Sequence, residues 1–503
     1  MINFSMMNTF FKIKNWWPWA AKITLLIALI VGLLIRCQPP TQKATAEAEK
    51  PNIIFILTDD LGAGDLGCTG HPYAQTPNID QLAIDGVRFT KAYMSASWCA
   101  PSRYGLMRGQ YPSREFYGTR NLMPEQPSVT KMLKEAGYAT AHFGKWHMNI
   151  GKKYSNSPSD FGIDEHLTIL SGGPTWSKEE RKDPYFRAKS TDKYVDLTMD
   201  FIQKQSIEKD NKPFYVNLWV APTHSYIDPT PEQLSVYKNL KVNLEDFKNP
   251  WQREFLEFVG QHGDINKSMQ AYCADLTALD KAVGRLMTFL KENGLEENTM
   301  IVFSSDNGPG PLTFQVEEES VVERYKKMPT LLNNVGSSGD YRDRKLSVHD
   351  GGIRVPLIVK WPKNAPKGKV DTETTFVGVD WLPTVASICG IDLPEANYDG
   401  HDLKTAFSGK AVKRETPVFW SENDYQKAVL SGNYKGTMNK AGEFFLYNIE
   451  NDPGEHKDLK SIETAKAEEV KSLLDNYLAT VPDMEQSKAQ FKAYRLSQKE
   501  VAH

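Results

Sequence analysis

The chain has few cysteines and no large excess of charge of either sign. Five of its 503 residues are cysteine, too few for a disulfide framework, and their spacings match no zinc-binding pattern. Cys68, Cys273 and Cys389 are therefore expected to be small buried side chains, whereas Cys37 and Cys99 have specific alternatives. The net charge of −3 argues against a nucleic-acid binder, but it is compatible with a local basic pocket for an anionic ligand.

The chain also lacks an apolar run long enough to cross a membrane comfortably. Residues 23–35 form an apolar stretch of thirteen residues, which suits the core of a signal peptide, and three lysines precede it. We predict that residues 1–36 are a signal peptide or a lipoprotein leader. Cys37 would then carry a lipid anchor, and residues 37–50 would form a polar tether. Arg36 departs from the small residue usual before a lipidated cysteine, so an uncleaved anchor or another cleavage site is the alternative. Either way we expect export to the periplasm or cell envelope.

Length and composition indicate a globular protein of two domains. A chain of 503 residues exceeds one ordinary hydrophobic core, and 40% hydrophobic with 24% charged residues is typical of folded proteins. Strands alternate with helices over residues 51–400, which predicts an α/β domain with a large, doubly wound, mostly parallel sheet flanked by helices. Residues 401–503 change to short strands and turns, which predicts a small C-terminal antiparallel subdomain.

Polar side chains follow the predicted strands of the large sheet at the points where the strands end. The continuous apolar run at residues 52–57 indicates a strand buried on both faces. Other strands are expected at residues 87–93, 139–143, 214–220, 300–303 and 357–360. The polar residues that come just after four of these strands are Asp59, Asp60, Lys145, His147, His224, Asp306 and Asn307. Because the carboxyl ends of parallel strands share one edge, we expect these side chains to form one ligand-binding site.

The polar residues at this edge suggest a metal ion and an anionic substrate. Asp59, Asp60, Asp306 and Asn307 offer oxygen ligands, which hard cations such as Ca²⁺ or Mg²⁺ prefer. A metal ion held there could bind an anion and activate an attacking hydroxyl. Fixed positive charge would come from Lys145 of this set and from two further residues, Arg103 and Lys345.

The most specific motif lies between the second and third predicted strands. It reads Cys99-Ala100-Pro101-Ser102-Arg103, followed by Leu106 and Gly109. Four fixed residue types recur by chance on the order of once in 10⁵ positions. A helix expected from Pro101 to Met107 would put Cys99 at a helix N-terminus, where negative charge is favoured. The motif resembles the signature of the type I sulfatases, a formylglycine-dependent family of the alkaline-phosphatase-like superfamily that includes bacterial polysaccharide-degrading enzymes.

The resemblance implies a role for each site residue. Cys99 would be oxidised to formylglycine, whose hydrate is the nucleophile, by a formylglycine-generating enzyme or an anaerobic maturation enzyme. The implied metal ligands are Asp59, Asp60, Cys99, Asp306 and Asn307, and the family favours Ca²⁺ over Mg²⁺. Arg103 and His147 would hold and activate the hydrate. Lys145, His224 and Lys345 would bind the sulfate and serve the leaving group, with His224 as the proton donor. Asp350 stands where a glutamate is commoner before Gly351-Gly352, and we expect this change to be structural and harmless.

The function predicted from these features is hydrolysis of sulfate esters on a sulfated glycan. One alternative is a phosphate or phosphonate monoester hydrolase of the same superfamily. The alternative from another class is a catalytically dead, glycan-binding surface lipoprotein. The loops at residues 151–192, 226–264 and 312–340 would choose the sugar, the sulfated position and exo or endo action, but they carry no readable code.

The roles of several other residues have two interpretations. His71 and His262 are expected to be loop or packing histidines rather than ligands, and His349 and His401 are left undecided. Some aromatic side chains are either core residues or walls on which a sugar could stack, namely Trp98, Tyr104, Trp176, Tyr185 and Tyr226.

Overall fold

The structure is a computed structural model that describes most of the chain after residue 49. The described residues are 50–114, 122–148, 157–169, 179–208, 212–310, 329–421 and 426–483, with 327, 485, 486 and 489. The predicted leader, Cys37, Trp176 and all of the tether except Lys50 lie outside them. Among the described residues, no helix has the length and apolar composition needed to cross a membrane. Residues 51–503 cluster as one unit, which holds all the elements below.

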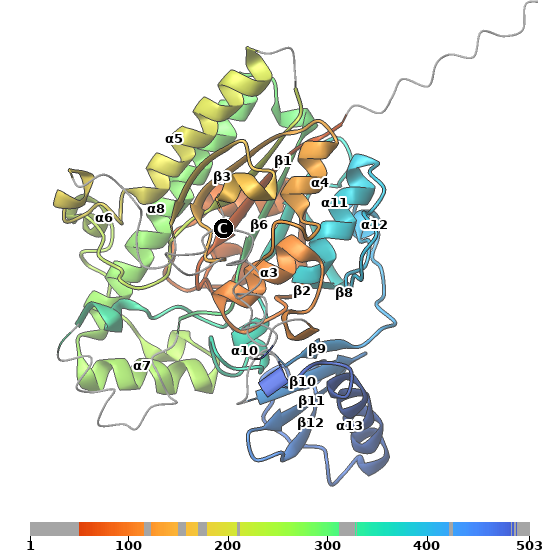
Figure 1. The fold of residues 1–503 in the computed structure, drawn as a ribbon. Coiled ribbons are helices and arrows are strands. Elements are labelled where there is room, and N and C mark those ends of the chain that lie inside the picture. The colour runs from red at the N-terminus through yellow and green to blue at the C-terminus, as the bar shows by residue number, and fades with distance from the viewer. Residues whose placement is uncertain are drawn as a thin grey trace, which may run out of the picture. The chain divides into compact units, whose positions relative to one another are not determined.

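A mixed sheet of eight strands forms the centre of this unit (Figure 1). In sheet order the strands are β4 (Glu165–Ile169), β3 (Ala139–Lys145), β5 (Phe214–Trp219), β1 (Asn52–Thr58), β6 (Thr299–Ser305), β7 (Leu357–Lys360), β2 (Val87–Tyr93) and β8 (Lys369–Val377). Strand β7 is antiparallel to both of its neighbours, whereas every other pair is parallel. Seven strands therefore share one direction, and their carboxyl ends lie at one edge of the sheet.

The sequence of β1 explains its central position. All seven residues of this strand are buried, so its side chains face protein on both sides of the sheet. Ile54 pairs with Val216 of β5 on one side and with Ile301 of β6 on the other. Because successive side chains point to opposite faces, Ile54 belongs to one hydrophobic cluster and Phe55 to another.

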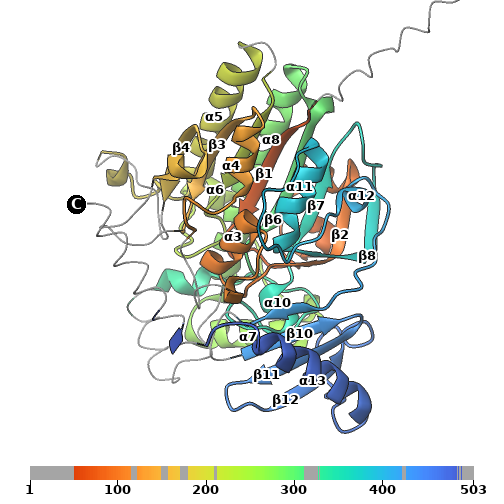
Figure 2. The same ribbon diagram turned by 45° about the vertical axis from the view of Figure 1, so that its right-hand side comes forward.

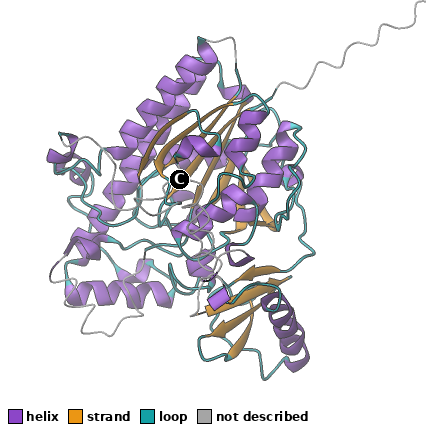
Figure 3. Ribbon diagram, viewed as in Figure 1, coloured by secondary structure: helices purple, strands orange, loops and turns teal. Residues whose placement is uncertain are grey.

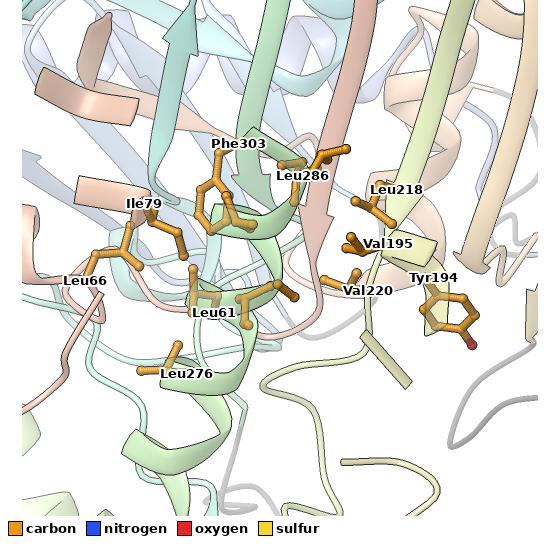
Figure 4. Close-up of a cluster of buried hydrophobic side chains, with 14 of the residues drawn as sticks. Leu61, Leu66, Ile79, Tyr194, Val195, Leu218, Val220, Leu276, Leu286 and Phe303 are labelled. Carbon is orange, nitrogen blue, oxygen red and sulfur yellow. The ribbon is translucent and has the colours of Figure 1, made fainter. Parts of the chain in front are cut away.

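Helices cover both faces of the sheet, as Figure 3 shows. One cluster receives side chains from α2 (Pro77–Ile84), α5 (Ser190–Ile202), α7 (Pro250–His262) and α8 (Ile265–Glu292). Figure 4 shows part of this cluster, in which Leu286 of α8 lies near Phe303 of β6. The opposite cluster receives side chains from α3 (Cys99–Arg108), α4 (Val129–Glu135), α11 (Trp381–Cys389) and α12 (Lys404–Phe407). The short helix α6 (Pro231–Ser235) precedes α7.

The C-terminal part forms a second, antiparallel sheet of four strands (Figure 2). Its order is β12 (Phe444–Asn448), β11 (Tyr434–Asn439), β10 (Gln426–Ser431) and β9 (Val418–Trp420), and α13 (Thr464–Leu478) packs against it. The predicted fold class, a mostly parallel sheet with a smaller antiparallel one, is therefore confirmed. The domain boundary between residues 400 and 401 stays a prediction.

Some elements depart from the sequence expectations. The edge strands β4 and β8 were not expected, because their exposed polar residues break the apolar pattern. Strand β11 was missed as well, since it contains Lys435 and Gly436, which are rare in strands. Helix α7 was missed although Asn249 caps it and Pro250 opens it, which is a readable start signal.

Candidate active site

Polar residues from four strands meet at the carboxyl edge of the large sheet. Asp59 and Asp60 follow β1, and Asp306 and Asn307 follow β6. The two strand ends are joined by backbone hydrogen bonds, because the Asp306 amide donates to the carbonyl of Thr58 at 3.1 Å. The Asp60 amide donates to Asp306 Oδ1 at 3.2 Å. Asp60 has a φ of 64°, in the left-handed region, a conformation that the surrounding contacts must hold in place.

Cys99 begins α3, and this helix is buried along its whole length. All ten of its residues are buried, and the helix starts two residues earlier than the sequence predicts. Arg103, one turn further along, donates to Asp306 Oδ2 from Nε at 2.8 Å and lies 2.7 Å from it through Nη2. Its Nη1 donates to the carbonyl of Lys145 at 2.7 Å, and its guanidinium lies over the ring of Trp219. Arg103 therefore ties α3 to the ends of β3, β5 and β6.

Two lysines reach the same group of carboxylates. Lys145 Nζ donates to Asp59 Oδ2 at 2.6 Å, and both side chains are buried. Lys345 Nζ donates to Asp60 Oδ1 at 2.6 Å and lies 3.2 Å from Cys99 Sγ. A buried cation and a largely buried one, so close to carboxylates and a thiol, form a polar site that can bind an anion.

The oxygen atoms of this site fit a hard cation. Within the described residues, Asp59 Oδ1 and Asn307 Oδ1 are buried and have no hydrogen-bond donor. Buried acceptors without a donor are costly unless a metal ion or water satisfies them. Possible ligand atoms within 4.8 Å of one another come from four residues, Asp59, Asp60, Cys99 and His224. Carboxylate and amide oxygens in this arrangement can hold a divalent metal ion.

Asp306 and His224 have different contacts with the possible metal ligands. Both oxygens of Asp306 accept hydrogen bonds, from Arg103 and from the Asp60 amide, although the second is long and leaves a lone pair of Oδ1 available. His224 Nε2 lies 3.8 Å from Asp60 Oδ2, and its Nδ1 lies 2.8 Å from the Ser225 carbonyl. That carbonyl requires a proton on Nδ1, so the neutral imidazole presents an unprotonated Nε2 to the acids.

Burial and charge move the pKa values of the site in opposite directions. Burial would raise the pKa of Asp59, but Lys145 and the other cations hold it well below its usual range. Burial raises the pKa of Asp306 to about 6, against the opposing effect of Arg103. Burial raises the pKa of the Cys99 thiol to about 11, although Lys145 and Lys345 oppose this. The unmodified thiol is therefore protonated at neutral pH and is a poor nucleophile.

His147 also lies at this edge, directly after β3 and Trp146. Its φ is 52°, in the left-handed region, and its Nδ1 is buried without a partner among the described residues. Burial, together with Lys145 and Arg103, lowers its pKa to about 2, so the imidazole is neutral. A neutral ring can form a hydrogen bond with a group bound at this position, but with so low a pKa it is a weak base unless a bound anion offsets the nearby cations.

The sequence did not identify the residues that support the loop after β1. Asp65 accepts hydrogen bonds from the Gly62 amide at 2.5 Å, the Ser337 amide at 2.6 Å and the Tyr272 hydroxyl at 2.6 Å. The Tyr272 hydroxyl oxygen also lies 3.0 Å from Thr223 Oγ1, and the Thr223 hydroxyl donates to the Asp60 carbonyl. An aspartate within the glycine-rich stretch after β1 was the one available signal for this network.

The structure also describes several histidines, tyrosines and cysteines that lie outside this group. His71 is buried and its Nδ1 accepts two backbone amides, which confirms a packing histidine. His262 Nδ1 contacts the Phe258 carbonyl within α7, also as expected. Tyr104 is fully buried in the core and cannot be a sugar-stacking wall, whereas Tyr226 is 42% exposed. Cys273 and Cys389 are buried cysteines outside any disulfide, as predicted, while Cys68 is only half-buried.

Comparisons with known proteins agree with this geometry. The model of the family described as "Sulfatase" matches residues 51–391, and that described as "N-sulphoglucosamine sulphohydrolase, C-terminal" matches residues 338–483. Human arylsulfatase A is 27% identical over 502 residues, covering 87% of this chain and 86% of that protein. An N-acetylgalactosamine-6-O-sulfatase of Bacteroides thetaiotaomicron is 27% identical over 472 residues, covering 82% and 88%. The crystal structure of Ps i-CgsB in complex with k-i-k-neocarrahexaose has a TM-score of 0.70 at 25% identity, covering 89% and 97%.

Proposed function

The chain belongs to the sulfatase family and is a sulfuric ester hydrolase, and we propose that it removes sulfate from a sulfated polysaccharide or oligosaccharide. The observation that carries this proposal is the position of Cys99. Its Sγ lies 3.2 Å from Lys345 Nζ, at a sheet edge where Asp59 Oδ1 and Asn307 Oδ1 are buried without a donor. Relatives that act on sulfated sugars by name support the substrate class.

We propose that Cys99 becomes the nucleophile only after oxidation to formylglycine by a maturation enzyme. The raised thiol pKa supports this, because an unmodified Cys99 would carry little negative charge. A formylglycine at this position would supply a hydrate hydroxyl as the attacking group. Arg103 would hold that group through its fixed guanidinium. His147 would accept a proton from it once a bound sulfate group offsets the charges of Lys145 and Arg103, which together with burial lower its pKa to about 2.

Lys145 and Lys345 would bind the oxygens of the sulfate group. Lys145 is buried and the side chain of Lys345 is 10% exposed, so both charges act close to a low-dielectric interior and need little reorganisation during the reaction. Their present partners, Asp59 and Asp60, are proposed metal ligands, and a bound metal would free both lysines for the substrate. His224 would give a proton to the leaving oxygen. Because its Nδ1 proton is held by the Ser225 carbonyl, the ring must first take up a second proton on Nε2, the nitrogen that lies 3.8 Å from Asp60 Oδ2.

A divalent ion, Ca²⁺ in preference to Mg²⁺, would be held by the oxygens of Asp59, Asp60, Asp306 and Asn307 and by the modified Cys99. It would supply positive charge that polarises a sulfate oxygen. Metal analysis of the purified protein tests this assignment. Asp306→Ala should lower the metal content and the activity together, and an unchanged metal content would contradict the ligand assignment.

We further propose that the protein is exported and anchored through Cys37 at the cell envelope. A leader of apolar residues followed by a polar tether supports this placement, which suits an enzyme that acts on external polysaccharide. The two domains would then be residues 51–400, with the site, and residues 401–503.

Matched sulfate and phosphate esters of the same sugar test the function. We expect faster hydrolysis of the sulfate ester, and Cys99→Ala should abolish turnover. Cys68→Ala is the control, because Cys68 is another free cysteine and belongs to none of the site groups. A faster phosphate reaction would favour the phosphatase alternative, and a Cys99→Ala variant with wild-type turnover would exclude Cys99 as the nucleophile. Binding of the glycan without any turnover would favour the dead glycan-binding lipoprotein.

A further inference from the structure

The segment that carries Lys345 is held by the C-terminal sheet. Residues 342–354 include the short helix α10 (Asp350–Ile353), which Figures 1 and 2 both show beside the four-stranded sheet. Arg342 donates to the Glu455 carbonyl at 3.1 Å, and the Val348 amide donates to Gln426 Oε1 at 3.0 Å. The position of this segment therefore depends on residues more than 70 positions away in sequence.

Lys435 of β11 makes two buried ion pairs beside this segment. Its side chain is fully buried, and its Nζ lies 2.6 Å from Asp350 Oδ1 and 3.1 Å from Glu455 Oε1. Arg354 completes the cluster through Asp350 Oδ2 at 3.0 Å, and Tyr93 donates to the same oxygen at 3.1 Å. Two cations and two carboxylates balance one another here. Burial would raise the pKa of Asp350, but Lys435 and Arg354 hold it below its usual value of 3.8.

Close backbone contacts connect Asp350 to the active site. The Gly351 amide donates to the Arg342 carbonyl at 2.7 Å, and the Gly308 amide donates to the Gly352 carbonyl at 2.9 Å. A Cβ on Gly308 would lie 1.9 Å from the Gly351 carbonyl oxygen, so α10 fits directly against the residue after Asn307.

The loop around Lys345, within residues 342–349, is also held by hydrogen bonds to the segments after β6 and before α3. The Lys345 amide donates to the Pro309 carbonyl at 3.1 Å, and the Leu346 amide donates to the Ser97 carbonyl at 2.8 Å. A shift of α10 would therefore move Lys345 relative to Cys99, because the loop is packed between α10, the end of β6 and the start of α3.

We propose that Lys435 is a positioning residue of the C-terminal sheet, which acts through Asp350 and α10 to set where the Lys345 ammonium lies. This inference rests on the proposed function, in which Lys345 binds the sulfate group. Rigid placement matters because a misplacement of about 1 Å can lower a rate by roughly 10²-fold.

The test compares variants that remove Lys435 with and without restoring the charge balance. Lys435→Met leaves two buried carboxylates with one cation. Lys435→Met/Glu455→Gln restores neutrality, so it should fold even if the single variant does not. The matched control is Arg414→Met, because Arg414 is another buried cation of the C-terminal region that pairs with Asp380, away from α10. Both kcat and KM on a sulfate ester are measured, together with the melting temperature.

We expect the double variant to lose about 10²-fold in kcat. Arg414→Met should keep kcat within about twofold, even at a lower melting temperature. If Lys435 had a merely structural role, its effect on kcat would be independent of Lys345. Each change is therefore repeated in a Lys345→Ala background. There, removal of Lys435 should cost little further activity. A wild-type kcat in the double variant, or losses that multiply in the Lys345→Ala background, would overturn the proposal.

Hydrogen exchange separates this inference from the proposed function. The amides of Lys345 and Gly351 should exchange faster in the double variant than in Arg414→Met, whether or not the enzyme turns over. If the wild-type protein hydrolysed no sulfate ester, the proposed function would fail, and the exchange rates would still decide the role of Lys435. Equal protection in the two variants would show that Lys435 does not hold the loop.

Discussion

Removing the Arg103 guanidinium tests the electrostatic account of the site. Arg103 is fully buried and contacts Asp306 Oδ2 through Nε at 2.8 Å and Nη2 at 2.7 Å. Arg103→Met would leave the Asp306 carboxylate buried without its main partner. Breaking a buried pair in this way costs about 3–5 kcal/mol, more than replacing both partners.

The size of the effect on melting follows from the size of the protein. The unit from Pro51 to His503 has roughly 450 residues, and unfolding entropy is about 2.1 cal/mol/K per residue. A loss of about 3–5 kcal/mol then lowers the melting temperature by about 3–5 °C. Melting is followed by scanning fluorimetry with a chelator present in every sample, so that differences in metal binding do not contribute.

The pH dependence has a definite sign. The folded pKa of Asp306, about 6, lies above its ordinary value of 3.8, so its protonated form favours folding. This stabilisation is full below pH 3.8 and is lost as the pH rises through the folded value. Without Arg103 the folded pKa rises further, so the deficit of Arg103→Met should be larger at pH 8 than at pH 5. The double variant Arg103→Met/Asp306→Asn should recover part of it. A wild-type melting temperature for Arg103→Met at pH 8, or additive losses in the double variant, would refute this reasoning.

Two further predictions concern a close backbone contact and a buried histidine. Gly308→Ala should lower the melting temperature and kcat, because the new Cβ would meet the Gly351 carbonyl oxygen at 1.9 Å. Gly260→Ala in α7 is the control and should be neutral or slightly stabilising, because its Cβ would make only an ordinary contact with Ile265 at 4.0 Å. Equal effects of the two substitutions would contradict the packing. His71 should be neutral because burial lowers its pKa to about 4, so its stabilisation is present above its ordinary value of 6.5 and is lost as the pH falls toward 4. His71→Gln should therefore melt with a weaker dependence on pH over that range, and an unchanged slope would argue against a buried neutral ring.

Strand ends were the part of the site that the sequence could predict. Asp59 and Asp306 are about 250 positions apart, yet the apolar runs before them indicated neighbouring strand ends, and the structure joins them through the Asp306 amide and Thr58. Lys345 follows no predicted strand, so the sequence offered it as a source of positive charge, and the resemblance to a family gave it a role in sulfate binding. The structure brings it to Asp60 and Cys99.

Other features depended on tertiary contacts that no local pattern reveals. No pattern in the sequence indicates that Lys435 is buried, and its burial becomes intelligible only when Asp350 and Glu455 are placed beside it. Asp65 and Tyr272 were missed for the same reason, since their hydrogen bond joins residues 207 positions apart. Asp350 itself was expected to be structural, and its buried ion pairs agree with that expectation.

The most direct test of the account is the mass of the tryptic peptide Ala92–Arg103. It should be measured on protein made in a host that can oxidise the motif, in a sample that hydrolyses a sulfate ester. We predict that Cys99 carries an aldehyde in place of the thiol, in proportion to the activity of the sample. Full activity in a sample whose Cys99 is entirely unmodified thiol would contradict the assignment of Cys99 as the precursor of the nucleophile.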